Sequence, residues 1–218
     1  METKQFKAAL FDLDGTLIDT EGQYSVFWGE IGRRYHPEIP DFSNIIKGTT
    51  LTRILNTYFP PETHKDVVTQ LDAWEAQMKY EFVVGAEAFV RNIRSRDVKC
   101  AIVTSSNGKK MESLRRCIPR FDNLFDRVLT AEMFTASKPA PDCYLLGAQV
   151  FGVEVGECIV FEDALSGLEA GMRAGMFTIG FPTTNPRDVI QTRCSLVADS
   201  FTELNYDLLN RLLLDRPQ

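Results

Sequence analysis

The chain has 218 residues, of which 44% are hydrophobic and 25% charged, and its formal net charge is -6. This length and apolar share are enough for one or two domains with a buried core. The negative charge argues against a general nucleic-acid or anionic-membrane surface, because its field repels phosphate groups. We therefore expect neither partner, whereas a small anionic substrate held by local positive charge is compatible with the composition.

The cysteines and the apolar runs bear on the compartment. The chain has five widely spaced cysteines and no CxxC pair, which favours free thiols in a reducing environment. No charged leader with an apolar core precedes the first predicted strand, and no apolar run approaches the ~20 residues that span a bilayer. We expect a cytoplasmic, monomeric protein.

The first predicted element is a short strand within Ala8 to Thr20, which reads AALFDLDGTLIDT. The apolar run ends in Asp12 and Asp14, followed by Gly15, as expected where a buried strand opens into a loop. Side chains alternate along an extended chain, so both carboxylates begin on the same side. Two adjacent acids are costly without a cation, a shared proton or hydrogen bonds, which makes this strand end a candidate for chemistry.

The next segment is helical throughout. Apolar residues recur at spacings of three and four, and prolines close two of the predicted helices. The predicted helices are Glu21–Tyr35, Phe42–Ile46, Leu51–Tyr58 and Thr63–Phe82.

After Gly85 the pattern changes to helices that alternate with short β-rich runs, which is typical of a parallel sheet covered by helices on both faces. The predicted strands are 100–103, 127–130, 158–161 and 177–181, and the predicted helices are one through Phe89 and Ile93, 111–118, 143–151, 165–173 and 199–214. The Asp12 strand needs partners and must join this sheet. The fold class is therefore α/β, a Rossmann-like core of residues 1–18 and 84–218 with an inserted all-helical cap domain of residues 19–83.

Polar residues follow several of these strands, and the carboxyl ends of parallel strands meet at one edge of a sheet. The candidates are Asp12 and Asp14, the run Thr104, Ser105, Ser106 and Asn107, the loop residue Lys138, and the pair Glu162 and Asp163. Considered singly, each of these groups could have a purely structural role, such as a helix cap or a solvated loop lysine. Together they predict a site for Mg²⁺ and a phosphate group.

The chain resembles the haloacid dehalogenase superfamily in four motifs. DLDGT at 12–16, IVTSSN at 102–107, SKPAPD at 137–142 and FEDALSGLEAG at 161–171 are similar to its four ordered motifs. A helical insertion directly after the first motif resembles the cap of the β-phosphoglucomutase and phosphoglycolate phosphatase branch.

The resemblance implies a role for each core residue. Asp12 would be the nucleophile that takes the phosphoryl group, and Asp14 the acid that protonates the leaving oxygen and then activates water. Thr104 and the backbone N–H of Ser105 would hold phosphate oxygens, and Lys138 would neutralise charge.

The metal and substrate residues complete the set. Asp12, Asp163 and the backbone carbonyl of Asp14 would hold Mg²⁺, with Glu162 in support. Thr16, Glu21 and Lys47 are the further candidates for contact with phosphate or substrate.

The residues at particular motif positions reduce the number of reactions that the resemblance allows. Asp14 is present, whereas dehalogenases of the superfamily lack this second acid. Tyr24 and Leu51 stand where a β-phosphoglucomutase has a cap histidine and a cap arginine. Leu51 cannot bind a second phosphate, although Arg53 is close enough in sequence to be a partial substitute. We therefore expect a magnesium-dependent phosphatase acting on a small phosphorylated metabolite, a sugar phosphate, through an aspartyl-phosphate. The alternatives are a phosphomutase, a pyrophosphatase or, from another class, a non-catalytic binding module.

Overall fold

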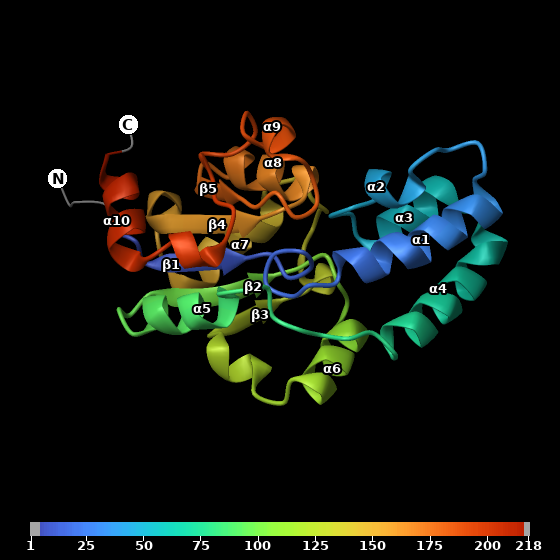
Figure 1. Cartoon of the computed structure of the whole chain (residues 1–218), viewed down its shortest axis with the longest axis horizontal. Coiled ribbons are helices and arrows are strands. Elements are labelled where there is room, and N and C mark those ends of the chain that lie inside the picture. Colours follow the sequence, from blue (N-terminus) through green and yellow to red (C-terminus); the bar gives the residue numbers. More distant parts are fainter. Residues whose placement is uncertain (1–4, 216–218) are drawn as a thin grey trace.

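The core of the molecule is a parallel sheet, seen in a computed structural model that describes residues 5–215 (Figure 1). Within these residues, six parallel strands lie in the order β3-β2-β1-β4-β5-β6. The strands are β1 (Ala8–Phe11), β2 (Lys99–Val103), β3 (Arg127–Leu129), β4 (Cys158–Glu162), β5 (Phe177–Gly180) and β6 (Leu196–Val197). In the register, Phe11 lies beside Ile102 and Phe161, so the central strands end at one level. This confirms the α/β class and the Rossmann-like sheet.

Helices cover both faces of the sheet because the strand residues alternate between two apolar clusters. Ala9 and Phe11 belong to one cluster and Ala8 and Leu10 to the other, and all four are fully buried. The helices that pack on the first face are α5 (Ala86–Arg94), α6 (Gly108–Cys117) and α10 (Tyr206–Leu214), and those on the second are α7 (Asp142–Phe151) and α8 (Leu165–Arg173). The central strand β1 is thus buried on both faces and on both edges.

The helices between β1 and α5 form a separate group beyond the carboxyl ends of the strands (Figure 1). They are α1 (Glu21–Tyr35), α2 (Phe42–Ile45), α3 (Leu51–Tyr58) and α4 (Pro61–Glu75). They share an apolar cluster of their own, which includes Phe27, Ile54 and Leu71. The chain enters and leaves this group side by side, because Ile18 and Phe82 form an isolated antiparallel bridge.

Two predicted helices were too long. α4 ends at Glu75, because Met78 and Tyr80 leave the helix to pack in the core on the sheet and Phe82 pairs with Ile18. The predicted final helix 199–214 is split into a 3₁₀ turn and α10, whose first turn is capped by Asn205 through a 2.9 Å bond from Leu208 N–H. Tertiary contacts overrode the helical periodicity in both places.

The remaining elements are short. Neither β6 nor α9 (Arg187–Ile190) was predicted, because they are only two and four residues long. The 3₁₀ helices are η1 (Phe121–Leu124), η2 (Ala131–Met133), η3 (Val155–Glu157) and η4 (Phe201–Glu203). All five cysteines are free.

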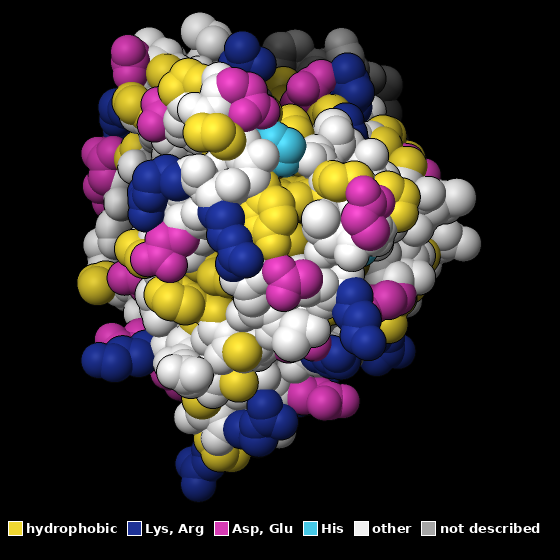
Figure 2. Space-filling view, turned by 90° about the vertical axis from the view of Figure 1, so that its right-hand side faces the viewer, with side chains coloured by type: hydrophobic (Ala, Val, Ile, Leu, Met, Phe, Trp, Pro, Cys, Tyr) yellow, Lys and Arg dark blue, Asp and Glu magenta, His cyan; other side chains and the backbone are white. Residues whose placement is uncertain are grey.

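The outer surface of the α1–α4 side carries mixed charge. Figure 2 shows this face with basic and acidic side chains interspersed and hydrophobic ones scattered between them. Across residues 5–215, no helix has both the length and the apolar character needed to cross a bilayer. A cluster of buried charged side chains lies inside the molecule, where β1 and β4 end.

Candidate active site

The centre of the site is a buried network of Asp12, Lys138 and Glu162. Lys138 Nζ lies 2.6 Å from Asp12 Oδ1 and 2.6 Å from Glu162 Oε1, and it also donates to the backbone carbonyl of Val103 at 3.2 Å. Asp12 follows β1, Glu162 ends β4, and Lys138 comes from the loop between β3 and α7. The parallel register brings these three chain segments together, as the sequence predicted for strand ends.

Glu162 is fully occupied by protein partners. Its Oε1 accepts from Lys138 and from the Tyr144 hydroxyl at 2.9 Å, and its Oε2 accepts from the backbone N–H groups of Asp163 and Ala164 at 2.9 and 3.0 Å. The packing requires glycine at position 167, because a Cβ there would lie 1.6 Å from Glu162 Oε1. Glu162 therefore fits as a residue that positions Lys138 and the start of α8.

Asp163 completes an acidic cluster at this edge. The Thr16 hydroxyl donates to Asp163 Oδ1 at 2.8 Å, and the Thr184 hydroxyl donates to Oδ2. Gly15 has φ +77°, and a Cβ there would lie 2.2 Å from Asp163 Oδ2, so the turn after Asp14 needs glycine. One carboxylate oxygen each of Asp12, Glu162 and Asp163 lie within 4.8 Å of one another.

The charges of this cluster do not balance. Three buried carboxylates, those of Asp12, Glu162 and Asp163, face one buried ammonium, that of Lys138. Burial raises the pKa of Asp12 from 3.8 to about 8, against the opposing effect of Lys138. Burial also raises the pKa of Asp163 well above its ordinary value, and the Glu162 charge adds to this rise. The surplus of two negative charges and the oxygen-only donor set fit a hard divalent cation such as Mg²⁺.

Asp14 does not join this cluster. Its Oδ1 accepts from the Thr20 hydroxyl at 2.5 Å and from Lys110 Nζ, and its Oδ2 accepts from the Ser106 hydroxyl at 2.9 Å. Burial alone would raise the pKa of Asp14, but the Lys110 ammonium and these hydrogen bonds hold it below its ordinary value. The two predicted acids thus occupy opposite environments.

Lys110 is a site residue that the sequence argument missed. Its side chain is 1% exposed, and its Nζ lies 4.3 Å from the centre of the Tyr24 ring as well as against Asp14. The available signal was its position on α6, four residues before the buried Leu114 and beside the buried Met111. A lysine on the apolar face of a helix needs a buried partner.

The loop that follows α2 lies over the strand ends. The Ser105 hydroxyl donates to the Gly48 carbonyl at 3.1 Å, and the Thr50 and Ser137 hydroxyls are 2.8 Å apart. Thr104 is 1% exposed, and its hydroxyl accepts from Ser106 N–H at 3.0 Å. Thr104 and Ser105 are therefore placed between the acidic cluster and the helices α1–α4.

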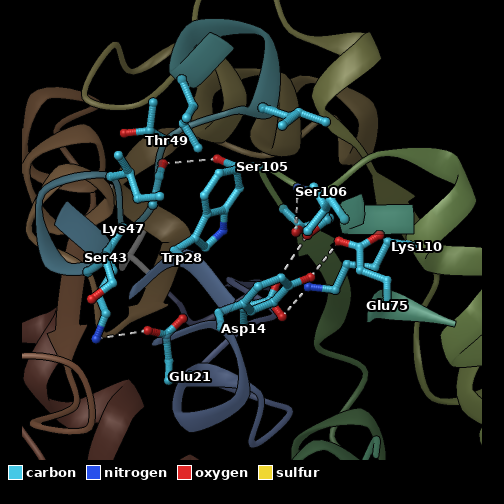
Figure 3. A pocket seen from close by; sticks show the side chains of 18 of the residues that line it. Asp14, Glu21, Trp28, Ser43, Lys47, Thr49, Glu75, Ser105, Ser106 and Lys110 are labelled. Atoms are coloured by element: carbon cyan, nitrogen blue, oxygen red, sulfur yellow. Dashed lines mark hydrogen bonds and ion pairs between the residues drawn. The ribbon is translucent and has the colours of Figure 1, made fainter. Parts of the chain in front are cut away.

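A pocket opens above Asp12 and Asp14 between the sheet and the helical group (Figure 3). Lys47 and Glu21 form an ion pair of 3.1 Å on one side, and Lys110 contacts Asp14 on the other. In Figure 3 the Trp28 indole lies between these two pairs. The structure thus brings every predicted site residue to this pocket or to the cluster beneath it.

The fold and site define an α/β protein with a Rossmann-like parallel sheet that carries acidic residues and a buried lysine at its strand ends. The sequence model of the haloacid dehalogenase-like hydrolase family matches residues 9–181. The chain belongs to this family, which confirms the resemblance noted in the sequence.

Individual proteins that this chain resembles include phosphatases and a hydrolase of known structure. Hexitol phosphatase A of Escherichia coli (strain K12) is 30% identical over 190 residues, which are 83% of this chain and 86% of the relative. Validoxylamine A 7'-phosphate phosphatase of Streptomyces hygroscopicus subsp. limoneus is 28% identical over 210 residues, 92% of this chain and 97% of the relative. The crystal structure of a family IA, variant 3 hydrolase from Entamoeba histolytica superimposes with a TM-score of 0.79 at 25% identity, covering 95% of this chain and 99% of that chain. These relatives support the prediction of an enzyme of the phosphoric monoester hydrolase type.

Proposed function

We propose that this protein is a magnesium-dependent phosphatase that hydrolyses a small phosphorylated metabolite, a sugar phosphate, through an aspartyl-phosphate on Asp12. The observation that carries the proposal is the geometry at Asp12. Its Oδ1 is held by Lys138 at 2.6 Å, while no hydrogen bond to its Oδ2 is found within residues 5–215. One oxygen is fixed and the other is available to attack.

The acidic cluster fits the metal. Asp12 and Asp163, with the backbone carbonyl of Asp14, would hold Mg²⁺, and Glu162 would support them through Lys138 and the α8 backbone. Bound Mg²⁺ supplies positive charge at the phosphoryl oxygens and offsets the surplus negative charge of the cluster.

The first step follows from the placement of Asp12. Its free carboxylate oxygen forms a bond to phosphorus as the bond from phosphorus to the leaving oxygen breaks. Lys138 and the Thr104 hydroxyl stabilise the transferring group, and the carboxyl of Asp14 donates a proton to the leaving oxygen. The negative charge of an arriving phosphoryl group favours the protonated form of Asp14 that this step needs.

The second step reverses the proton transfer. Asp14, now a carboxylate, takes a proton from water as the water oxygen attacks phosphorus. The bond from phosphorus to Asp12 breaks, and inorganic phosphate leaves with Asp12 restored. Thr20 and Ser106, which hold Asp14 at 2.5 and 2.9 Å, provide the polar surroundings between the two steps.

We also propose the two-domain division at residues 1–18 plus 84–218 and 19–83, with a cytoplasmic monomer as the working form. The separate apolar cluster of α1–α4 supports the division. Movement of this cap would admit the substrate and then exclude water from the aspartyl-phosphate.

A phosphomutase is the second candidate, and the pocket gives it less support. A bisphosphate needs a cation for its second phosphate. Within the described chain, both lysines of the pocket are already paired, Lys47 with Glu21 and Lys110 with Asp14.

The test is a phosphate-release screen over sugar phosphates, nucleotides, phosphoglycolate and pyrophosphate with Mg²⁺ present. We expect turnover of sugar phosphates that is lost in Asp12→Asn and kept in Asp19→Asn, a matched change at an exposed aspartate of the same loop. Turnover that survives Asp12→Asn would refute the mechanism. Faster conversion of β-glucose 1-phosphate to glucose 6-phosphate than phosphate release would favour the mutase, dominant pyrophosphate hydrolysis would favour the pyrophosphatase, and metal binding without turnover would favour the binding module.

A further inference from the structure

The pocket above Asp12 is lined by several acidic side chains. Within the described chain, its lining contains more carboxylates than cations. The acids are Asp12, Asp14, Glu21 and Glu75, and the cations are Lys47 and Lys110. Lys138 pairs with Asp12 from below, and the two lining lysines pair with Glu21 and Asp14. Glu75 is left without an ion pair among the described residues.

Glu75 is buried, and a hydrogen bond holds its carboxylate in place. Its side chain comes from the last turn of α4 and the residue is 6% exposed. The Tyr24 hydroxyl donates to Glu75 Oε1 at 2.7 Å, and the Tyr24 ring is in turn covered by Lys110 at 4.3 Å. Figure 3 shows Glu75 beside Lys110, on the opposite side of the pocket from Lys47 and Glu21. Burial raises the pKa of Glu75, whereas the Lys110 ammonium and the hydrogen bond from Tyr24 favour its charged form. In that form the carboxylate attracts hydrogen-bond donors and repels anions.

The rest of the wall on the cap side is largely apolar. Trp28, which is 6% exposed, lies with Ile46, Leu51, Ile54 and Leu71 along this wall. Such a surface packs against the carbon face of a substrate and offers no charge to it. The uncharged polar side chains of the cap in this lining include Ser25, Ser43 and Thr49. Among the described lining residues, Glu75 is the carboxylate without an ion pair, so the selection by charge depends on Glu75.

We propose that Glu75 is the specificity-determining residue of the pocket and that the substrate is a phosphomonoester whose leaving group is uncharged or cationic, carries hydrogen-bond donors and bears no second anionic group. This inference rests on the proposed phosphatase function and deepens it. A hydroxyl or an ammonium of the leaving group donates to Glu75, whereas a carboxylate or a second phosphate is repelled by the Glu75 carboxylate, which has no ion pair among the described residues.

The first test compares three six-carbon substrates that share a primary phosphate ester. They are glucose 6-phosphate, glucosamine 6-phosphate and 6-phosphogluconate, with neutral, cationic and anionic leaving groups. We expect kcat/KM for the first two to exceed that for 6-phosphogluconate by at least about tenfold, the ratio that 1.4 kcal/mol produces. Equal or faster turnover of 6-phosphogluconate would overturn the proposal.

The second test removes the charge of Glu75. Glu75→Gln keeps the size and the acceptor for Tyr24, so the preference for glucose 6-phosphate over 6-phosphogluconate should fall about fivefold or more. The matched control is Asp72→Asn, on the same helix, where the carboxylate pairs with the exposed Lys109 at 2.8 Å outside this pocket. The control should keep the original ratio. An unchanged ratio in Glu75→Gln, with the fold verified by thermal melting, would assign selection elsewhere.

A third measurement separates this inference from the proposed function. Calorimetric binding of the same three compounds to Asp12→Asn with Mg²⁺ reports charge selection without turnover, and we expect 6-phosphogluconate to bind most weakly. That binding order without any hydrolysis by the wild type would refute the phosphatase and leave the selection standing. Hydrolysis without that order would refute the selection alone, and neither binding nor hydrolysis would refute both.

Discussion

The hydrogen bonds of Asp14 determine its state before a substrate arrives. Thr20, Ser106 and Lys110 hold the carboxylate and keep its pKa below the ordinary value, whereas burial raises the pKa of Asp12 to about 8. Asp12 and Asp14 belong to the same motif and are separated by one residue. Their pKa values shift in opposite directions because their neighbouring side chains differ. The raised pKa suits Asp12, which a cation would ionise for nucleophilic attack. The lowered pKa suits Asp14, which an incoming anion would cause to take up a proton.

The raised pKa of Asp12 predicts a pH-dependent response to Mg²⁺. The folded protein without metal holds a proton on Asp12 that the unfolded chain releases near pH 3.8, so this group's contribution to stability is lost as pH rises from about 4 to about 8. Metal binds the ionised form, so it restores more stability at the upper end.

The measurement is the melting temperature with and without Mg²⁺. We expect the gain on adding Mg²⁺ to be larger at pH 8 than at pH 6, and this difference between the two pH values to shrink in Asp12→Asn, whose side chain does not titrate. A larger gain at pH 6 would contradict the assignment of Asp12 to the metal site.

A second prediction at this scale concerns Gly167. In Gly167→Ala the new Cβ would lie 1.6 Å from Glu162 Oε1, so the carboxylate must leave Lys138 and the α8 backbone. We expect a loss of about 2 kcal/mol in the free energy of unfolding, as for other overpacked cores, together with weaker phosphatase activity.

The matched control is Gly29→Ala within α1, where a Cβ would make an ordinary 3.6 Å contact with Arg33. Chemical denaturation of both variants gives the comparison. Equal stability of Gly167→Ala and the wild type would show that Glu162 is not held as described.

The sequence identified single residues unevenly. Asp12, Lys138 and Asp163 could be predicted because acidic and basic residues at strand ends are informative when several strands share one edge. Lys110 and Glu75 could not be assigned to the site, because one belongs to a helix rich in other charges and the other to the end of a long polar helix. Their burial depends on how α4 and α6 approach each other across the pocket.

At the scale of elements, the loop between α2 and α3 connects the helical group to the strand ends. Three contacts come from this loop: Ser105 to Gly48, Ser166 to Lys47 and Thr50 to Ser137, at 3.1, 3.4 and 2.8 Å. Arg53, at the start of α3, donates to the Lys138 carbonyl at 3.3 Å. The contacts of Thr50 and Arg53 reach the loop that carries the lysine of the acidic cluster. The loop therefore links closure of the pocket to the position of Lys138.

This link predicts the effect of Thr50→Val. The change keeps the shape and removes the 2.8 Å hydrogen bond to Ser137, which is worth about 1 kcal/mol. Because this bond exists only when the loop is seated, we expect KM to rise by roughly fivefold with little change in kcat. Steady-state kinetics on the best substrate of the screen measures both constants.

Thr52→Val, at an exposed position of α3, is the control and should behave like the wild type. If Thr50→Val and Thr52→Val have the same KM, the seated loop does not contribute to substrate binding.

Element boundaries were predictable where local patterns agreed with tertiary contacts. α1 and α3 have the predicted bounds, since their apolar faces pack in the α1–α4 cluster over their whole length. The predicted helix that reached Phe82 was wrong after Glu75, because pairing with Ile18 and packing of Tyr80 depend on residues far away in the sequence.

At the scale of the whole molecule, the helical group and the sheet have separate apolar clusters joined by two adjacent chain segments (Figure 1). The proposed closure is therefore a hinge motion about residues near Ile18 and Phe82. We expect the radius of gyration from solution scattering to fall when Mg²⁺ and a phosphate-mimicking fluoride are added. Asp12→Asn should show no change, and unchanged scattering of the wild type would argue against closure.

The most direct test of the aspartyl-phosphate uses p-nitrophenyl phosphate, whose leaving group needs no proton. In Asp14→Asn the first step should proceed and the second should be slow, so the phosphorylated protein should accumulate. After rapid acid quenching, mass spectrometry is expected to find one phosphoryl group on the peptide that contains Asp12, and none when Asp12→Asn is added. Release of p-nitrophenol by Asp14→Asn without any phosphorylated peptide would contradict catalysis through Asp12.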